Sequence, residues 1–254
     1  MICSSPGLIL KIFPYSNTSI ICHAFTREHG RLNFIAKGIR KPKNPLLSIL
    51  QPFNLIDFQY YYKKNRSMQL IKEADIVASF NHIRKDLSTI IMSGSILNII
   101  NKTFEDEYPH EIIFRLIHKT LGNLSHNHTH NKISFIFFLF HLSKQLGFMP
   151  NIDQCINCNV LFKDDAIFSA NSSSLVCVDC NIHKTSDADM VVNYETLVLL
   201  KLINKTHIKQ ISDLDVSNQS LIALYAFLIF FMKTNIPAMH NIKGLSELTK
   251  LYHA

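Results

Sequence analysis

Residues 25–43 read FTREHGRLNFIAKGIRKPK, and this stretch decides the fold that we expect for the first third of the chain. After the turn signal Glu28-His29-Gly30, apolar residues recur at every second position from Leu32 to Ala36. This period of two predicts a strand with Leu32, Phe34 and Ala36 on one face. Gly38 then allows a sharp turn among the cations Lys37, Arg40, Lys41 and Lys43. A short strand that ends in a basic loop is typical of a small β-barrel that presents cations to a polyanion.

Four further strands are expected around this one. β-Branched and aromatic residues between turn signals predict them over residues 7–13, 19–26, 53–62 and 68–77. A short helical turn is expected over 46–50, between Pro45 and Pro52. Five short strands with one longer connection between the third and the fourth favour an OB-fold barrel, although an SH3-like barrel would produce much the same pattern.

The excess positive charge of the chain is concentrated in this part. The 254 residues carry a formal net charge of +7. Residues 1–80 hold eleven Lys or Arg against four Asp or Glu, whereas the remainder holds fifteen of each. The excess could simply promote solubility, but the cations gather at turns rather than along whole faces, which indicates an anionic partner.

Composition also bounds the class of protein. With 47% hydrophobic and 18% charged residues, the chain is globular rather than disordered. The first residues lack the basic and apolar regions of a secretory signal. The longest apolar run, Leu221–Met232, has twelve residues, so we expect a buried helix there rather than a membrane span. Six cysteines without such a signal favour free thiols in a reducing cytoplasm.

From residue 79 onward the periodicity becomes helical. Ser79 or Asn81 is the expected N-cap of a first helix, and Gly122 is expected to end a second. The run 132–146 is apolar on all sides, which places it at the centre of a bundle. We therefore predict an α+β multidomain protein with an OB-fold nucleic-acid-binding domain at 1–78, an α-helical domain at 79–150 and 190–254, and an inserted zinc-binding segment at 151–189.

The inserted segment carries the sharpest motif of the chain, Cys155-x2-Cys158-x18-Cys177-x2-Cys180. Each Cys-x-x-Cys pair can form a knuckle that directs two thiolates at one tetrahedral centre, and a hairpin between the pairs would bring the knuckles together. Four protein ligands leave no open position, so the motif predicts structural Zn²⁺. A metal-free remnant and a redox pair are the alternatives, and His183 is not needed as a ligand.

Common catalytic motifs are absent from the sequence. It contains no His-Glu-x-x-His, no Walker-type Gly-Lys-Ser/Thr loop, no Gly-x-Ser-x-Gly elbow and no deaminase signature. The histidines at 126, 128 and 130 are expected to lie in a solvated loop. The sequence therefore favours a binding protein over an enzyme.

Binding of nucleic acid is the function that the remaining residues favour. Cations can neutralise phosphates, and the candidates are Arg27, Arg31, Lys37, Arg40, Lys41, Lys43, Lys63, Lys64 and Arg66. Aromatic residues can stack on unpaired bases, and the candidates are Phe34, Phe53, Tyr60, Tyr61 and Tyr62. Core packing is the better expectation for each aromatic residue singly, but at least one of the three tyrosines should face outward, because successive residues of a strand alternate between its faces.

The sequence resembles the RecO family of bacterial recombination mediators. The similarity lies in G-L-I-L-K at 7–11, in the stretch 25–43, and in L-Q-P-F at 50–53. It continues along the whole chain, because the order of barrel, helices and inserted four-cysteine segment is also that of the family. The basic stretch and the cysteine spacing carry the resemblance, whereas the helical part is generic.

This resemblance implies a non-enzymatic DNA repair and recombination protein. Family members bind single- and double-stranded DNA, anneal complementary strands, and engage RecR and the C-terminal tail of the single-strand-binding protein to help load RecA. Arg27, Arg31, Lys37, Arg40, Lys41 and Lys43 match the family's basic stretch, and Cys155, Cys158, Cys177 and Cys180 match zinc-binding positions that some members lack. The implied location is the bacterial cytoplasm, in association with the nucleoid.

Two other functions fit the residues without the resemblance. One is an RNA-binding factor of the translation or transcription machinery with an OB-fold and a zinc ribbon. The other is an interaction scaffold whose basic barrel binds an acidic protein. Annealing of single-stranded DNA would separate the mediator from both.

Overall fold

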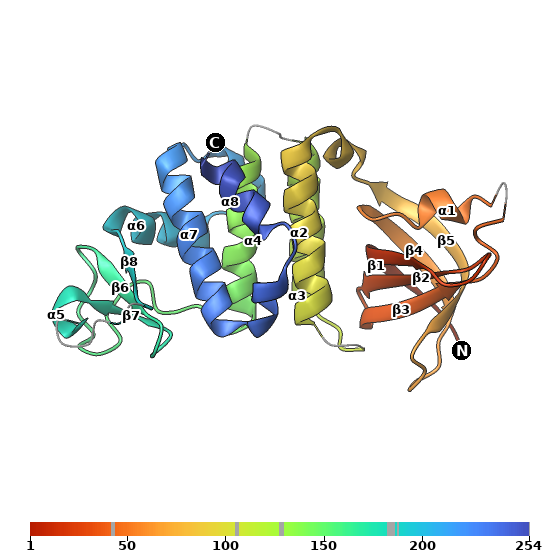
Figure 1. Ribbon diagram of the computed structural model, residues 1–254, viewed down its shortest axis with the longest axis horizontal. Helices are drawn as coiled ribbons and strands as arrows, with labels where there is room; N and C mark the ends of the chain where they lie inside the picture. Colours follow the sequence, from red (N-terminus) through yellow and green to blue (C-terminus); the bar gives the residue numbers. More distant parts are fainter. Residues whose placement is uncertain (42–43, 105–106, 127–129, 182–185, 187, 254) are drawn as a thin grey trace. The chain divides into compact units, whose positions relative to one another are not determined.

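The chain divides into two compact units, and each is described by itself. The computed structural model describes residues 1–41, 44–104, 107–126, 130–181, 186 and 188–253 (Figure 1). The first unit, here called the barrel unit, comprises Met1–His128 and Ile242–Gly244. The second, called the cysteine unit, comprises Thr129–Asn241 and Leu245–Ala254. The expected α+β class, with an N-terminal barrel followed by helices, is confirmed. The three domain ranges given above remain a prediction.

The barrel unit begins with a closed five-stranded barrel (Figure 1). Its strands are β1 (Ile2–Pro14), β2 (Ile20–Thr26), β3 (Gly30–Ala36), β4 (Asn54–Tyr61) and β5 (Gln69–Ser79). They follow the order β1-β2-β3-β5-β4, and α1 (Leu46–Ile49) lies in the connection between β3 and β4. Neighbours are antiparallel except β3 and β5, which pair in parallel through Phe34–Gln69 and Ile35–Leu70. This strand order confirms the OB-fold prediction.

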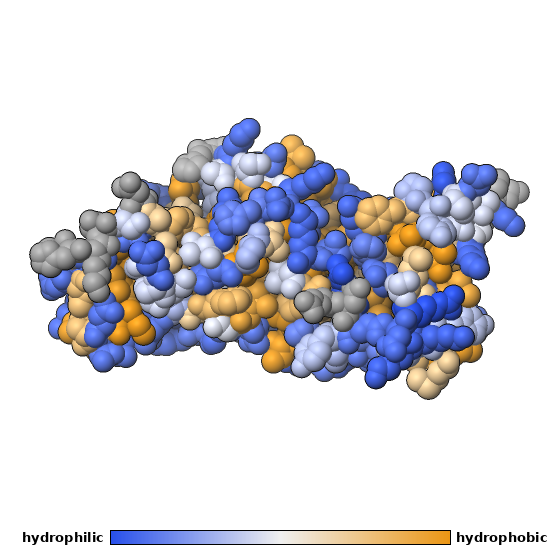
Figure 2. All heavy atoms as spheres, turned by 60° about the horizontal axis from the view of Figure 1, so that its bottom comes forward, coloured by the Kyte–Doolittle hydropathy of each residue, from blue (hydrophilic) through white to orange (hydrophobic). Residues whose placement is uncertain are grey.

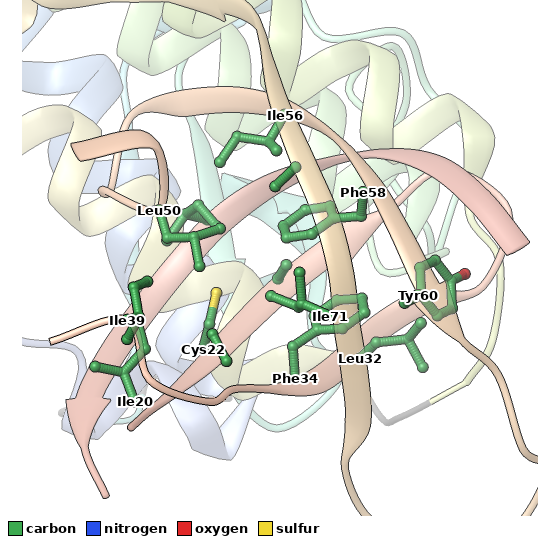
Figure 3. Close-up of a cluster of buried hydrophobic side chains, with 14 residues drawn as sticks. Ile20, Cys22, Leu32, Phe34, Ile39, Leu50, Ile56, Phe58, Tyr60 and Ile71 are labelled. Atoms are coloured by element: carbon green, nitrogen blue, oxygen red, sulfur yellow. The ribbon is translucent and has the colours of Figure 1, made fainter. Parts of the chain in front are cut away.

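Alternating side chains from every strand fill the barrel (Figure 3). Leu32, Phe34 and Ala36 are all buried, so the predicted inward face of β3 is confirmed. The Phe34 ring stacks on Phe58 with centroids 4.7 Å apart, and Tyr60 meets Phe34 edge-on at 5.1 Å. Such aromatic pairs contribute about 0.5–1.5 kcal/mol beyond the area that they bury.

The turn between β2 and β3 depends on Gly30. Its backbone has φ +65°, and the Thr26 hydroxyl donates a 2.9 Å hydrogen bond to its carbonyl oxygen. A Cβ atom at this position would lie 1.9 Å from the carbonyl oxygen of Tyr108, which precedes α3 (Glu111–His126). The predicted turn at 28–30 is therefore confirmed, and two independent constraints require glycine there.

Two helices complete the described fold of this unit, and they correct two sequence predictions. Residues Asn81–Lys85 form a 3-10 turn, η1, so the first long helix, α2 (Leu87–Thr103), begins after it. Asp86 is its N-cap, because the carboxylate accepts a 2.8 Å hydrogen bond from the Thr89 N–H. Gly122 lies inside α3, which continues to His126 because Leu124 beyond it is buried.

Three further helices of the cysteine unit contact α4 (Asn131–Gln145). They are α6 (Tyr194–Lys205), α7 (Asn218–Asn235) and α8 (Leu245–His253), with 3-10 turns η3 (Ile208–Asp213) and η4 (Pro237–Asn241). Phe135, Phe138 and Phe140 of α4 are all buried, which confirms its predicted central position. The run 221–232 lies in α7 as a largely buried helix. Within the described residues, no helix is both long and apolar enough to cross a membrane.

Substitution of Gly30 tests the barrel. We expect Gly30→Ala to lower the free energy of unfolding by about 2 kcal/mol or more, because the new Cβ adds a backbone clash to an unfavourable φ. Urea denaturation followed by circular dichroism measures this change.

Gly94→Ala is the matched control. Gly94 lies within α2, and a Cβ there meets no atom within 4 Å, so the same substitution should stabilise the protein by about 0.5–1 kcal/mol. Equal stability of the two variants would contradict the proposed role of Gly30.

Candidate nucleic-acid interface and metal centre

The first group of predicted cations lies on the turn that follows β3. Gly38 has φ +70°, as the predicted sharp turn requires, and buried Ile39 anchors the turn in the barrel core. Lys37 and Lys41 are exposed. Arg40 is also exposed, and its Nη1 donates to the Ser16 carbonyl oxygen at 3.0 Å, which ties the turn to the β1–β2 loop. Lys43 lies outside the described residues.

A second group lies on the turn between β4 and β5. Lys63, Lys64 and Arg66 are exposed there. Gln69, the first residue of β5, is buried, and its amide holds the turn: Nε2 donates to the carbonyl oxygens of Lys63 at 3.0 Å and Arg66 at 3.2 Å. The Lys63 N–H donates to Gln69 Oε1 at 2.9 Å. The sequence analysis did not identify Gln69 as the residue that positions this turn. Its one indication in the sequence is a polar residue at the start of a predicted strand.

The remaining two predicted cations are engaged within the protein. Arg27 forms a 2.6 Å ion pair with Glu111 of α3, and both side chains are about half exposed. Arg31 donates from Nη1 to the Asn101 carbonyl oxygen of α2 at 2.7 Å. These contacts connect the barrel to its two helices, so the two arginines have a structural role whether or not they also contact a ligand.

The two exposed groups lie at different points along β3. Ala36 pairs with Ile20 and leads into the turn at 37–41, whereas Asn33 donates to the Ser67 carbonyl oxygen of the other turn at 3.4 Å. The exposed cations that are predicted to contact phosphates therefore form two groups, one on each of two turns of the barrel. Figure 2 shows hydrophilic side chains gathered over the barrel, at the right of that view.

Two of the five predicted aromatic candidates are packed inside the barrel. Phe34 and Tyr60 are buried, and a 2.9 Å hydrogen bond joins the Tyr60 hydroxyl to His29 Nδ1. Tyr62 is half-buried, with its ring 4.6 Å from that of His29. Tyr61 is 41% exposed, which confirms that one of the three tyrosines faces outward.

The four predicted metal ligands converge in the cysteine unit. The Sγ atoms of Cys155, Cys158, Cys177 and Cys180 all lie within 4.8 Å of one another, and Cys158 and Cys177 are 3.7 Å apart. Four thiolates around Zn²⁺ at 2.3 Å stand about 3.8 Å apart, so the cluster has nearly the dimensions of a tetrahedral site. Among the described residues, no other group of three or more potential ligands comes together. His128 and His183 lie outside those residues.

Short elements around the cluster hold the cysteines in place. The Cys155 N–H donates to the Val160 carbonyl oxygen at 2.9 Å, and Asn159 turns the first knuckle with φ +60°. Cys177 ends β7 (Ser174–Cys177), which pairs with β6 (Ala166–Ser169), and Cys180 lies in α5 (Val178–Asn181). The predicted hairpin between the knuckles is thus confirmed. β6 also pairs with β8 (Met190–Val192).

The pKa values of the clustered cysteine thiols favour binding of a cation. Burial alone would raise the pKa of the Cys155 thiol, but N–H donors of Cys177, Cys158 and Asn157 outweigh it and lower the pKa to about 6. Hydrogen bonds to the sulfurs of Cys177 and Cys158 raise the pKa of the Cys180 thiol to about 12. The Cys155 thiolate is therefore stable at neutral pH, whereas the Cys180 thiol keeps its proton. A bound divalent cation would displace the remaining protons.

Family comparisons cover nearly the whole chain. The family described as "Recombination protein O N terminal" matches residues 1–80, and "Recombination protein O C terminal" matches residues 84–241. The chain is similar to the DNA repair protein RecO of Syntrophomonas wolfei, with 24% identity over 97% of this chain and 96% of that protein. The RecO of Caldicellulosiruptor saccharolyticus is 26% identical over 83% and 84% of the two chains, and that of Prosthecochloris aestuarii is 29% identical over 61% and 59%. The chain therefore belongs to the RecO family of DNA repair proteins.

Proposed function

We propose that this protein is a recombination mediator that binds single- and double-stranded DNA on its barrel and anneals complementary strands. With RecR, it would help to load RecA onto DNA coated by the single-strand-binding protein, whose C-terminal tail it would engage. It would act in the bacterial cytoplasm, at the nucleoid, by binding rather than by catalysis. The observation that carries this proposal is an OB-fold barrel with two exposed cationic turns in a chain of the RecO family.

The exposed cations favour a phosphate backbone as the ligand. Within the described residues, no carboxylate forms an ion pair with Lys37, Lys41, Lys63, Lys64 or Arg66. Their charge is therefore available to a partner, whereas Glu111 already neutralises Arg27. Loops of OB-folds commonly bind oligonucleotides, and cations at such loops release counterions from the strand when they bind.

Annealing follows from the same charges. Two DNA strands repel each other, and a surface that neutralises both lowers that repulsion. Two cationic turns at different points along β3 can each hold one backbone. Base pairing between the strands then supplies the driving force, so no catalytic group is required.

Reversal of the first cationic turn tests DNA binding. We expect the variant Lys37→Glu/Arg40→Glu/Lys41→Glu to bind a labelled single-stranded oligonucleotide at least tenfold more weakly. The slope of the logarithm of the binding constant against the logarithm of the salt concentration should become less negative by about 2, because three phosphate contacts are lost. Fluorescence polarisation across a salt series measures both quantities.

A control with the same change in net charge is Lys205→Glu/Lys209→Glu/Lys250→Glu, in which all three positions are exposed and lie in the cysteine unit. It should retain most of the affinity and the salt slope. Equal losses in the two variants would show that only net charge matters, and would refute a site on the turn.

Neutralisation of the second turn separates binding from annealing. We expect Lys63→Ala/Lys64→Ala/Arg66→Ala to slow the annealing of complementary oligonucleotides by a larger factor than it weakens binding of one strand. The reason is that annealing needs two strands held together, whereas binding needs one. Fluorescence energy transfer between labelled strands measures annealing. If the substitutions reduce annealing and single-strand binding by the same factor, the idea that each cationic turn holds one strand is wrong.

We further propose that Cys155, Cys158, Cys177 and Cys180 hold one structural Zn²⁺. When bound, the ion would cross-link four thiolates and so stabilise the short strands around them. The fit rests on the four converging sulfurs and on the stabilised Cys155 thiolate.

Metal analysis of purified protein tests this assignment. We expect one zinc per chain, and Cys158→Ser should lose most of the metal and lower the thermal unfolding midpoint. Cys3→Ser, whose sulfur lies on β1 of the barrel unit, should keep both unchanged. Full stability of the Cys158→Ser variant without metal would rule out a structural ion.

A further inference from the structure

An open groove lies between α1 and β5 of the barrel unit. Its volume is about 720 Å³, within the range of small-molecule sites. Its lining includes the apolar side chains of Leu47 and Ile76 and the polar side chains of Gln51 and Arg84. No carboxylate lines it.

The groove exists because no element fully covers the inner face of β5 near Ile76. Ile76 pairs with Ile56 of β4, so both side chains project from the same face of the sheet, and Ile56 is fully buried in the core. Ile76 is nevertheless 47% exposed. Beyond Leu70, β5 no longer pairs with β3, and α1, which has no buried residue, is the element across the gap. Leu47 of α1 is itself 41% exposed. Two apolar side chains therefore line an open mouth of the barrel.

Polar groups of a suitable kind surround these apolar side chains. Carboxamides of Asn44, Gln51 and Asn81 line the groove, and such groups can match the donors and acceptors of a base edge. Asn44 is engaged within the protein through both polar atoms, Gln51 through Nε2 and Asn81 through Oδ1, which leaves Gln51 Oε1 and Asn81 Nδ2 for a base. Arg84 is held in place because it donates to Asn81 Oδ1 at 2.6 Å and to the Pro52 carbonyl oxygen at 2.7 Å. Its charge excludes a cationic occupant.

The groove is continuous with the first cationic turn. Asn44 of the groove donates from Nδ2 to the Gly38 carbonyl oxygen at 3.3 Å, and Gly38 lies between Lys37 and Lys41. An occupant that extends from groove to turn would thus meet apolar and amide groups first and then cations. Single-stranded nucleic acid has this chemistry, because flat apolar bases with polar edges alternate with phosphates along it.

We propose that the groove between α1 and β5 binds unpaired bases of a single strand whose phosphates contact the turn at 37–41. This inference rests on the proposed DNA binding and adds to it a site for bases. The bases would pack on Leu47 and Ile76, and Gln51 Oε1 and Asn81 Nδ2 would hydrogen-bond to their edges.

Two oligonucleotides of equal length and charge test the inference. One is a 12-nucleotide deoxythymidine strand, and the other is a 12-nucleotide abasic strand with the same phosphates. Fluorescence polarisation should show that the wild-type protein binds the thymidine strand at least fivefold more tightly. Leu47→Ser/Ile76→Ser should lose this preference and keep its affinity for the abasic strand.

The control is Leu87→Ser/Ile112→Ser, which removes the same side-chain types from exposed positions of α2 and α3, 68% and 55% exposed, and should retain the preference. If the first double variant fails to fold, Leu47→Asn replaces it, since no residue of α1 is buried. Equal wild-type affinity for the two strands, or a preference that survives in the groove variant, would overturn the base site alone. Failure to bind either strand would overturn the proposed DNA binding as well.

Discussion

The parallel pairing of β3 with β5 is the constraint on which the rest of the barrel depends. It closes the barrel through only two residue pairs, Phe34–Gln69 and Ile35–Leu70. Because β5 must start beside the middle of β3, the turn before it returns along β3, and buried Gln69 holds that turn by its backbone. One short pairing therefore both completes the hydrophobic core and positions three exposed cations.

The same brevity leaves the groove open. A longer β3–β5 ladder would pair the free edge of β5 and leave less room for an open groove beside Ile76. In the described part of the connection between β3 and β4, the one helix is α1, a single helical turn too short to bury a hydrophobic face. The barrel is thus stable around the stacked Phe34 and Phe58 rings and remains accessible at one mouth. The stable core and the proposed binding surface are thus separated within one small domain.

The cysteine segment meets a different constraint. Its strands β6, β7 and β8 have three or four residues each, which is too little sheet to be stable alone. Phe168 supplies one attachment, because its ring meets Phe227 and Phe231 of α7 edge-on at 6.0 and 5.6 Å. Convergent thiols offer a second, since a metal bound by all four, as proposed, would join the two knuckles as a cross-link.

The sequence by itself determined the strands of the barrel, the central helix α4, and the four convergent cysteines. These features follow from local patterns: a period of two, an apolar run, and paired Cys-x-x-Cys motifs. It misplaced the start of α2, because Ser79, Asn81 and Asp86 are all acceptable caps and only the packing of η1 selects Asp86. It also expected Gly122 to end α3, whereas burial of Leu124 outweighs the weak helix propensity of glycine. Tertiary structure alone decided which cations are available. Arg27 and Arg31 look the same as Lys37 and Lys41 in the sequence, but two groups more than 60 residues away, the Glu111 carboxylate and the Asn101 carbonyl oxygen, engage the two arginines, whereas Lys37 and Lys41 are exposed.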